Sequence, residues 1–276
     1  MEVGMLTVPF RNTSFKTVLD FAVEAGIPCL EVAAPPGSKH IDPARLDAAA
    51  VRKVRDGLEK RGLKITSLGH YTNTTDPAAR NKVQIHAKKC IDAAAKLGVP
   101  TVCMLAGMPV KGLSKIETIR KVVPKVFKPI LTHARKRGIN IALENYFATC
   151  LQGIDTFECM FETIPDDNFG LNYDPSHLVH QQCDHLLPVS MFADRIFHTH
   201  AKDTLVDKAK RAKVGIYGAG WWRYVIPGFG NIDWGEYVSH LRMIGYDGVL
   251  SIEHEDSAQT REEGFIRGAR YLEQFC

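Results

Sequence analysis

The feature that most constrains the fold of this sequence is a unit that recurs along its length. The unit is a short β-prone apolar run, a polar or glycine-containing loop, an amphipathic stretch, and a glycine just before the next run. The contexts AGI, RGL, LGV, RGI and IGY place these glycines where a helix ends in a left-handed residue. Strands that alternate with helices are joined by crossovers, so the unit predicts parallel strands.

The runs predicted to be strands span residues 4–10, 28–34, 63–71, 100–107, 139–146, 169–174, 195–203 and 247–255. The helices predicted between them include residues 42–61, 78–97, 114–137 and 261–275. Eight such units in 276 residues fit a single-domain α/β fold, a (β/α)8 TIM barrel over residues 1–276.

The competing α/β architecture is a doubly wound sheet, which would carry a phosphate-binding glycine loop after its first strand. No such loop follows the run at 4–10. The motifs GAG at 218–220 and PGFG at 227–230 occur late and complete neither GxGxxG nor GK[ST]. Their glycines are therefore predicted to lie in loops, and the barrel is the better interpretation.

Composition excludes several classes of protein. No apolar run approaches the ~20 residues of a membrane helix, and the N-terminus lacks the pattern of a secretory signal. The net charge of +4 comes from scattered lysines and arginines, which gives no indication of nucleic-acid binding. The seven cysteines include no CxxC pair and several lie in apolar runs, which indicates reduced, buried thiols in a cytoplasmic protein.

Polar side chains close four consecutive predicted strands. In a barrel, the residues of the active site lie at the carboxyl ends of the strands. The fifth strand ends at Glu144, the sixth at Asp174, the seventh at His198 and His200, and the eighth at Glu253 and Glu255. Three carboxylates and one imidazole favour Mn²⁺ or Mg²⁺, with Co²⁺ or Zn²⁺ as alternatives. A divalent cation would also offset the cost of bringing buried carboxylates together.

Several motifs resemble those of the sugar phosphate isomerase/epimerase family, and the resemblance covers nearly the whole chain. The motifs are LEN at 143–145, DPSH at 174–177, HTHAKD at 198–203, WWRYVIPGFGNIDW at 221–234 and SIEHED at 251–256. This family of xylose isomerase-like TIM barrels includes tagatose and psicose 3-epimerases, inosose-metabolising enzymes and hydroxypyruvate isomerases. The motifs are specific for the superfamily and do not identify the substrate.

The resemblance implies roles for individual residues. The implied metal ligands are Glu144, Asp174, His200 and Glu253. Glu144 and Glu253 would also face each other across the substrate as the pair that transfers protons, and His177 would contact a substrate hydroxyl. Glu255 lies in phase with Glu253 and is the alternative ligand on the eighth strand.

Other polar residues are candidates for contacts with the substrate. Glu31, His70 and Lys202 close their predicted strands and are expected to hydrogen-bond sugar hydroxyls. The alternatives are structural polar contacts for Glu31 and His70, and a local ion pair with Asp203 for Lys202.

The insertion after the seventh strand adds two further candidates. Trp222 offers an aromatic face for a sugar ring, and Arg223 offers a guanidinium for an anionic group. A dimer contact or lid packing is an equally good interpretation of both. No phosphate-binding loop is recognisable, so a phosphorylated substrate is not assumed.

These observations predict an enzyme that acts on a ketose, keto-sugar or inosose. Proton abstraction next to the carbonyl would give a metal-stabilised enediolate, with Mn²⁺ expected first. Return of the proton gives isomerisation or epimerisation, whereas loss of a β-hydroxyl from the same intermediate gives a dehydratase. The expected partner is a small sugar or polyol ketone, with no nucleic acid and no membrane. The family implies a homodimer or homotetramer.

Two rival functions remain from other classes. The AP endonucleases of the superfamily need further histidines for three metals, but the segment CMLAGMPV at 103–110 offers none and no Asp-x-His follows the seventh strand. A non-catalytic sugar-binding subunit would be favoured if Glu144 or Glu253 were missing, and both are present.

Overall fold

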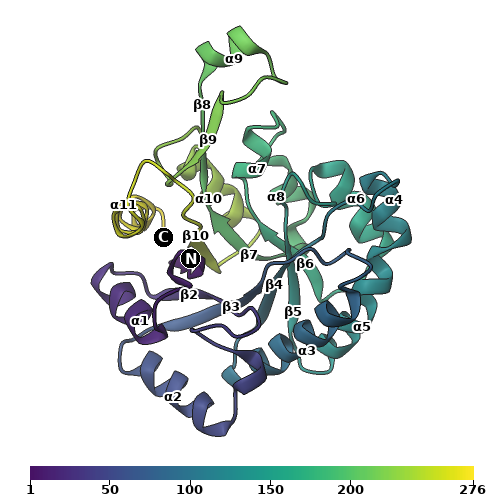
Figure 1. The fold of residues 1–276 in the computed structure, drawn as a ribbon. Coiled ribbons are helices and arrows are strands. Elements are labelled where there is room, and N and C mark those ends of the chain that lie inside the picture. Colours follow the sequence, from purple (N-terminus) through teal and green to yellow (C-terminus); the bar gives the residue numbers. More distant parts are fainter.

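The computed structural model describes residues 1–276 and contains a closed barrel of parallel strands (Figure 1). Around the barrel the strands follow the order β1-β10-β7-β6-β5-β4-β3-β2. They are β1 (Glu2–Leu6), β2 (Cys29–Ala33), β3 (Lys64–His70), β4 (Thr101–Leu105), β5 (Asn140–Glu144), β6 (Phe169–Tyr173), β7 (Ile196–Ala201) and β10 (Val249–Ile252). All eight predicted strands are present, and the predicted TIM barrel is confirmed.

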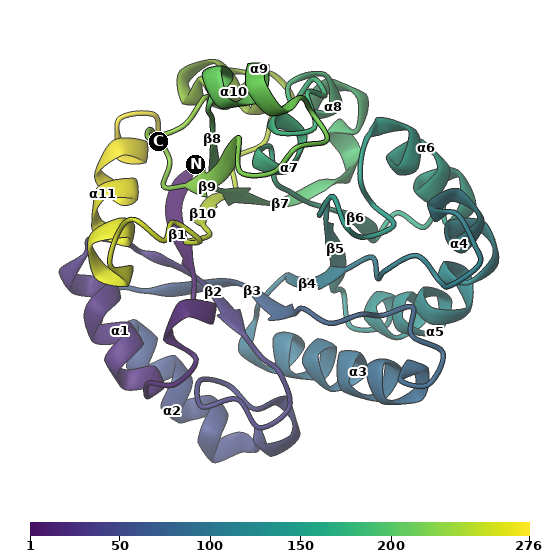
Figure 2. The same ribbon diagram turned by 45° about the horizontal axis from the view of Figure 1, so that its top comes forward.

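A ring of helices surrounds the barrel (Figure 2). Its longer members are α1 (Phe15–Glu24), α2 (Ala48–Glu59), α3 (Arg80–Leu97), α4 (Lys115–Lys121), α5 (Val123–Arg135), α6 (Ile154–Thr163), α10 (Trp234–Met243) and α11 (Arg261–Glu273). The short helices are α7 (Ser176–Val179), α8 (Leu187–Met191) and α9 (Lys208–Val214), with 3₁₀ turns η1 (Val8–Phe10), η2 (Pro43–Arg45) and η3 (Ala193–Arg195). No helix is long and apolar enough to cross a membrane.

The glycines of the recurring unit have the predicted conformation. All five adopt a positive φ between 64° and 77°; they are Gly26, Gly62, Gly98, Gly138 and Gly245. No atom lies within 4 Å of a Cβ built on any of them, so the requirement for glycine here is conformational rather than steric. The five helices that precede these glycines, α1, α2, α3, α5 and α10, therefore end where the sequence pattern indicates.

Several predicted boundaries differ from the structure, and proline explains two of the differences. The first strand was expected over 4–10 but ends at Leu6, because Pro9 lacks an N–H and lies in the η1 turn. The helix expected over 114–137 is divided at Val122 into α4 and α5, and Pro124 lies in the first turn of α5.

The insertion after β7 contains an antiparallel hairpin that the sequence pattern did not reveal. Strand β8 (Asp203–Val206) pairs with β9 (Trp222–Val225), and α9 lies in the connection between them. In Figure 1 this arm rises away from the barrel. The long connection hides the two short strands, because a hairpin is recognised in sequence by a tight turn.

Asp203 anchors the loop that follows the hairpin. Its carboxylate accepts hydrogen bonds from the backbone N–H groups of Gly228, Gly230 and Ile232 and from the indole N–H of Trp234, at 3.0–3.2 Å. A Cβ on Gly230 would lie 2.2 Å from the Asp203 carboxylate, so this position requires glycine. The aspartate of HTHAKD is thus hydrogen-bonded to the backbone of the glycines of PGFG.

Asp203→Ala should lower the free energy of unfolding by about 3 kcal/mol, because it leaves buried donors without an acceptor. Urea denaturation followed by circular dichroism measures the change. Asp207→Ala is the matched control, since Asp207 caps the exposed α9 and its loss should cost about 1 kcal/mol. Equal losses in the two variants would show that Asp203 does not anchor the loop.

Candidate metal and substrate site

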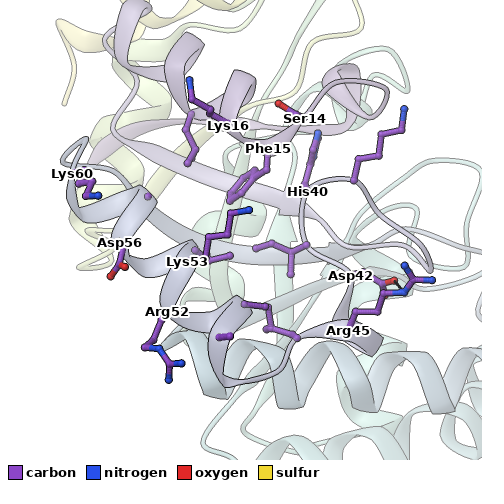
Figure 3. Close-up of a pocket in the computed structure, with 18 of the residues that line it drawn as sticks. Ser14, Phe15, Lys16, His40, Asp42, Arg45, Arg52, Lys53, Asp56 and Lys60 are labelled. Carbon is purple, nitrogen blue, oxygen red and sulfur yellow. Dashed lines mark ion pairs between the residues drawn. The ribbon is translucent and has the colours of Figure 1, made fainter.

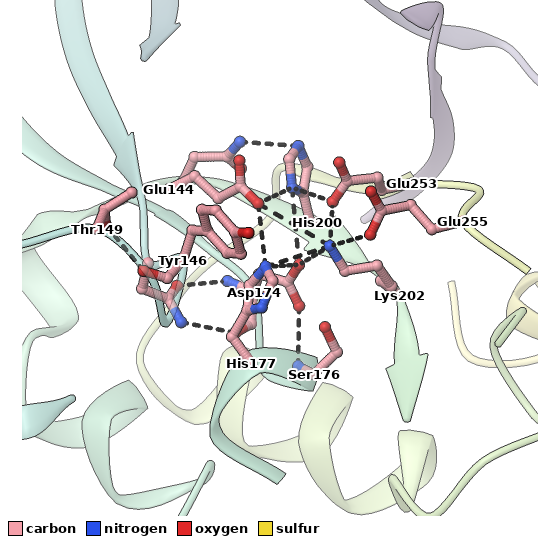
Figure 4. Close-up of polar contacts among 12 residues, drawn as sticks. Glu144, Tyr146, Thr149, Asp174, Ser176, His177, His200, Lys202, Glu253 and Glu255 are labelled. Carbon is pink, nitrogen blue, oxygen red and sulfur yellow. Dashed lines mark hydrogen bonds and ion pairs between the residues drawn. The ribbon is translucent and has the colours of Figure 1, made fainter. Parts of the chain in front are cut away.

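Four side chains converge at the carboxyl ends of neighbouring strands (Figure 4). They are Glu144 at the end of β5, Asp174 directly after β6, His200 in β7 and Glu253 directly after β10. One ligand atom from each lies within 4.8 Å of the ligand atoms of the other three. These strands are adjacent in the barrel, so the fold itself brings together the four residues predicted as ligands.

Two atoms in this cluster could bind a cation. Oδ2 of Asp174 and Nδ1 of His200 are buried without hydrogen-bond partners. Nδ1 of His200 lies 3.2 Å from Glu253 Oε2, 3.7 Å from Glu144 Oε1 and 3.9 Å from Asp174 Oδ2. Three carboxylates and one imidazole nitrogen that face a common point form a donor set that fits a hard divalent cation.

The electrostatics of the cluster favour the ionised forms of Glu144 and Glu253. Burial alone would raise the pKa values of these two carboxyl groups, but contacts with nearby basic side chains outweigh it. Lys202 and His200 lower the pKa of Glu253, and His177 and His200 lower that of Glu144. In turn the carboxylates raise the pKa values of His200 and Lys202 well above their usual range, against the effect of burial. The site is therefore a concentration of negative charge that requires positive partners.

Lys202 belongs to the site rather than to a local ion pair with Asp203. Its Nζ donates to Glu253 Oε2 at 2.6 Å and lies 3.1 Å from Asp174 Oδ2 and 3.3 Å from Glu255 Oε2. The Glu255 side chain is 47% exposed and is not part of the four-residue cluster. Of the two glutamates considered for the eighth barrel strand, the geometry thus favours Glu253 as a ligand.

The motifs LEN and DPSH fix the backbone around Asp174. The Asn145 side chain donates to the Asp174 carbonyl and accepts from its N–H, both at 2.7 Å. His177 follows in α7, where its Nε2 lies 3.2 Å from Glu144 Oε1 and its Nδ1 lies 2.6 Å from the Tyr224 hydroxyl. His177 is therefore held between a proposed ligand and the hairpin.

A cavity of about 280 Å³ opens beside the cluster. It is lined by Leu6, Val8, Tyr71, Leu105, Glu144, Tyr146, His177, Lys202, Tyr224, Glu253 and Glu255. The three tyrosines were not identified from the sequence. For Tyr71 and Tyr146 the available sequence signal was their position just after a strand end. For Tyr224 it was its place in the WWRY motif.

The remaining predicted substrate contacts lie outside this lining. The Glu31 carboxylate is fully buried beneath the cluster, and the His70 ring packs 4.5 Å from that of His86. Trp222 stacks on His180 with ring centroids 3.9 Å apart.

Arg223 does not line the cavity either. Its guanidinium donates to the Asp256 carboxylate at 2.6 Å, which ties the hairpin to the loop after β10. For Trp222 and Arg223 the packing interpretation fits the geometry better than direct contact with a substrate.

A larger cavity, of about 880 Å³, lies away from this cluster, beside α1 and α2 (Figure 3). Its rim is rich in lysine and arginine, and several of these pair with nearby carboxylates, as Lys16 and Arg61 do with Asp20. None of the four clustered residues lines it. The larger cavity is therefore not the one that contains residues of the four-residue cluster.

Comparison with protein families assigns the chain. Residues 19–275 match the family described as xylose isomerase-like TIM barrel, and the chain belongs to this family. The uncharacterized protein YfiH of Bacillus subtilis (strain 168) is 26% identical, over 99% of both chains. The inosose dehydratase of Geobacillus thermodenitrificans (strain NG80-2) is 25% identical over 52% of this chain, which spans about half of that relative.

Solved structures with the same fold include two of particular relevance. The IOLI protein with a bound zinc atom has a TM-score of 0.77 and 22% identity, over 99% of this chain and 96% of that one. D-psicose 3-epimerase, solved in the presence of D-fructose, has a TM-score of 0.75 and 17% identity, over 100% and 98%. At these identities the likeness concerns the fold.

Asp174→Ala should weaken binding of Mn²⁺ by more than about 100-fold, beyond the effect of losing a supporting contact. Isothermal titration of the metal-free protein measures the affinity. Asp256→Ala is the control, because its carboxylate pairs with Arg223 outside the cluster. Unchanged Mn²⁺ affinity in Asp174→Ala would contradict the four-ligand site.

Proposed function

We propose that the protein is a divalent-metal-dependent isomerase or epimerase of a ketose, keto-sugar or inosose, with Mn²⁺ as the expected metal. One observation carries the proposal. Of the four clustered residues, Glu144 and Glu253 also line the cavity, whereas Asp174 and His200 do not. Two carboxylates with lowered pKa values therefore reach the space where a substrate would lie.

The residues of the site suit proton transfer next to a carbonyl. A bound divalent cation would supply Lewis acidity that makes the neighbouring C–H easier to ionise. Glu253 would then take the proton, and Glu144, protonated in the substrate complex, would give its own proton to the opposite face, which inverts the stereocentre and leaves the removed proton on Glu253. Lys202 and His177 line the same cavity and are placed to hold substrate oxygens.

The lining of the cavity supports a neutral substrate. Lys202 contributes the one ammonium group, and carboxylates already surround it. No arginine lines the space. A volume of about 280 Å³ is appropriate for a small polyol ketone. A phosphate or carboxylate on the substrate would meet the negative charge of the cluster, so we favour an unphosphorylated sugar or inosose.

A dehydratase is the second candidate, favoured by the similarity to an inosose dehydratase over half of the chain. The first step is the same removal of a proton by a cavity carboxylate. Expulsion of a β-hydroxyl then replaces the return of the proton. Both candidates need the same four clustered residues, and the product distinguishes them.

Incubation with ketoses, 3-keto sugars and inososes in D₂O with Mn²⁺ should introduce deuterium next to a carbonyl. Proton NMR after removal of the metal detects the exchange, and a parallel incubation with EDTA is the control. The product separates epimerase, isomerase and dehydratase. Absence of exchange across the panel, from protein that binds Mn²⁺, would contradict the proposed function.

Glu253→Gln should keep the fold and lower turnover by about 10²–10⁴-fold, because an amide cannot carry the proton. Deuterium exchange and circular dichroism measure these two effects. Glu255→Gln is the matched comparison, since Glu255 lines the cavity outside the cluster, and its effect should be smaller. Near-normal turnover in Glu253→Gln would assign the proton carrier to another residue.

A further inference from the structure

The positive charge of the chain is concentrated around the larger cavity, the one of about 880 Å³ beside α1 and α2 (Figure 3). Seven lysines and arginines and two aspartates line it, which gives the lining a formal charge of +5, whereas the whole chain carries +4. These basic residues are scattered between positions 16 and 61 of the sequence, and the fold brings them together. The lining therefore differs in charge from the rest of the protein, which is close to neutral.

Most of these basic side chains are not neutralised by the protein. Three of the seven form an ion pair with a carboxylate, at 2.6–3.6 Å. The other four have no carboxylate oxygen within 4.0 Å; they are Lys39, Arg52, Lys53 and Lys60. In Figure 3 the side chain of Lys53 extends toward the ring of Phe15, in the middle of the lining. Like charges around one cavity repel one another, and an anion bound between them offsets that repulsion.

The packing of α2 leaves this space open. Of the eight longer helices of the ring, α2 is the one that contains no buried residue. It approaches α1 at Gly57, where a Cβ would lie 3.4 Å from Leu19 Cδ1. Beside the cations, the lining includes the buried side chains of Leu19, Ile41 and Leu46 and the half-buried ring of Phe15. The cavity therefore offers apolar and aromatic surface together with positive charge.

These properties define the chemistry of a ligand. The volume lies within the range of about 300–1,000 Å³ that is typical of sites for small molecules. Figure 3 shows Lys16, Arg45 and Lys60 on different sides of the cavity. Cations on several sides suit a compact ligand with more than one negative charge, such as a chain of phosphates, better than an extended polymer. The ring of Phe15 offers a face on which a planar group can stack.

We propose that this cavity is a second binding site, which takes a small phosphorylated ligand with an aromatic body, of the class of the nucleoside diphosphates. Lys53 and the other unpaired cations hold the phosphates, and Phe15 stacks on the aromatic part. The cavity beside the four-residue cluster is unsuited to such a ligand in the metal-free protein, because three carboxylates and one ammonium group line it. The proposal depends neither on the metal site nor on the proposed function.

Isothermal titration of the metal-free protein with ADP, in a buffer without phosphate or divalent cations, tests the site. ADP should bind at least about 10-fold more tightly than pyrophosphate or adenosine, because it alone uses both the cations and the aromatic ring. Salt at about 1 M should weaken the binding of ADP, since it screens exposed charges. Without a divalent cation, the four-residue cluster cannot hold the phosphates through a metal.

Two variants separate the roles of charge and ring. Lys53→Glu should weaken the binding of ADP by about 10-fold or more, because it replaces an attractive charge by a repulsive one. Lys128→Glu is the matched control, since Lys128 is exposed on α5 and does not line the cavity, and its affinity for ADP should stay within about twofold. Phe15→Leu should weaken the binding of ADP about 5–10-fold and leave that of pyrophosphate unchanged. Circular dichroism checks that each variant is folded.

Absence of ADP binding by the unmutated protein would overturn the proposal. Equal affinities of Lys53→Glu and Lys128→Glu for ADP would also overturn it, because the effect would then come from the net charge of the protein and not from this cavity. Pyrophosphate binding as tight as that of ADP, or normal ADP binding by Phe15→Leu, would overturn the assignment of an aromatic ligand. Weaker binding of ADP by Lys53→Glu and Phe15→Leu, with the control unaffected, supports the site.

Discussion

The interaction on which the functional architecture depends is the mutual repulsion of three carboxylates held together in a buried site. Glu144, Asp174 and Glu253 lie within a few ångströms of one another with little access to water. Such an arrangement is costly unless positive charge balances it. The protein supplies the ammonium group of Lys202, and the donor set adds a place for a divalent cation. In the proposed function, metal binding and proton transfer would both follow from this electrostatic requirement.

The parallel barrel meets this requirement through its geometry. Each strand delivers a side chain to the same end, so residues far apart in the sequence become neighbours without long loops. Beneath the cluster, Glu31 and Asn172 contact the Nε2 atom of His200, and its Nδ1 atom faces the cluster. The β strands thus bring the four side chains together, and buried polar side chains contact the imidazole from below.

Much of this could be predicted from the sequence because it depends on local patterns. Glycines at helix ends set the repeat, and polar residues at strand ends identified the cluster. The sequence did not reveal the depth of Glu31 within β2 or the direction of His70, because both depend on how strands and helices pack. The hairpin was missed because its strands are short and far apart, and prolines divided elements whose apolar pattern was continuous.

The anchor between Asp203 and the loop at 228–234 separates two parts of the insertion. Tyr224, on the anchored side, contacts His177 and the cavity, whereas α9 and the turn after it lie on the outer arm. Tyr217 in that turn is 98% exposed. The length and composition of the arm can therefore change, in evolution or by protein engineering. The Asp203 anchor would still hold the wall of the cavity in place next to β7. Substitutions in the outer arm can therefore leave the residues that line the cavity unchanged.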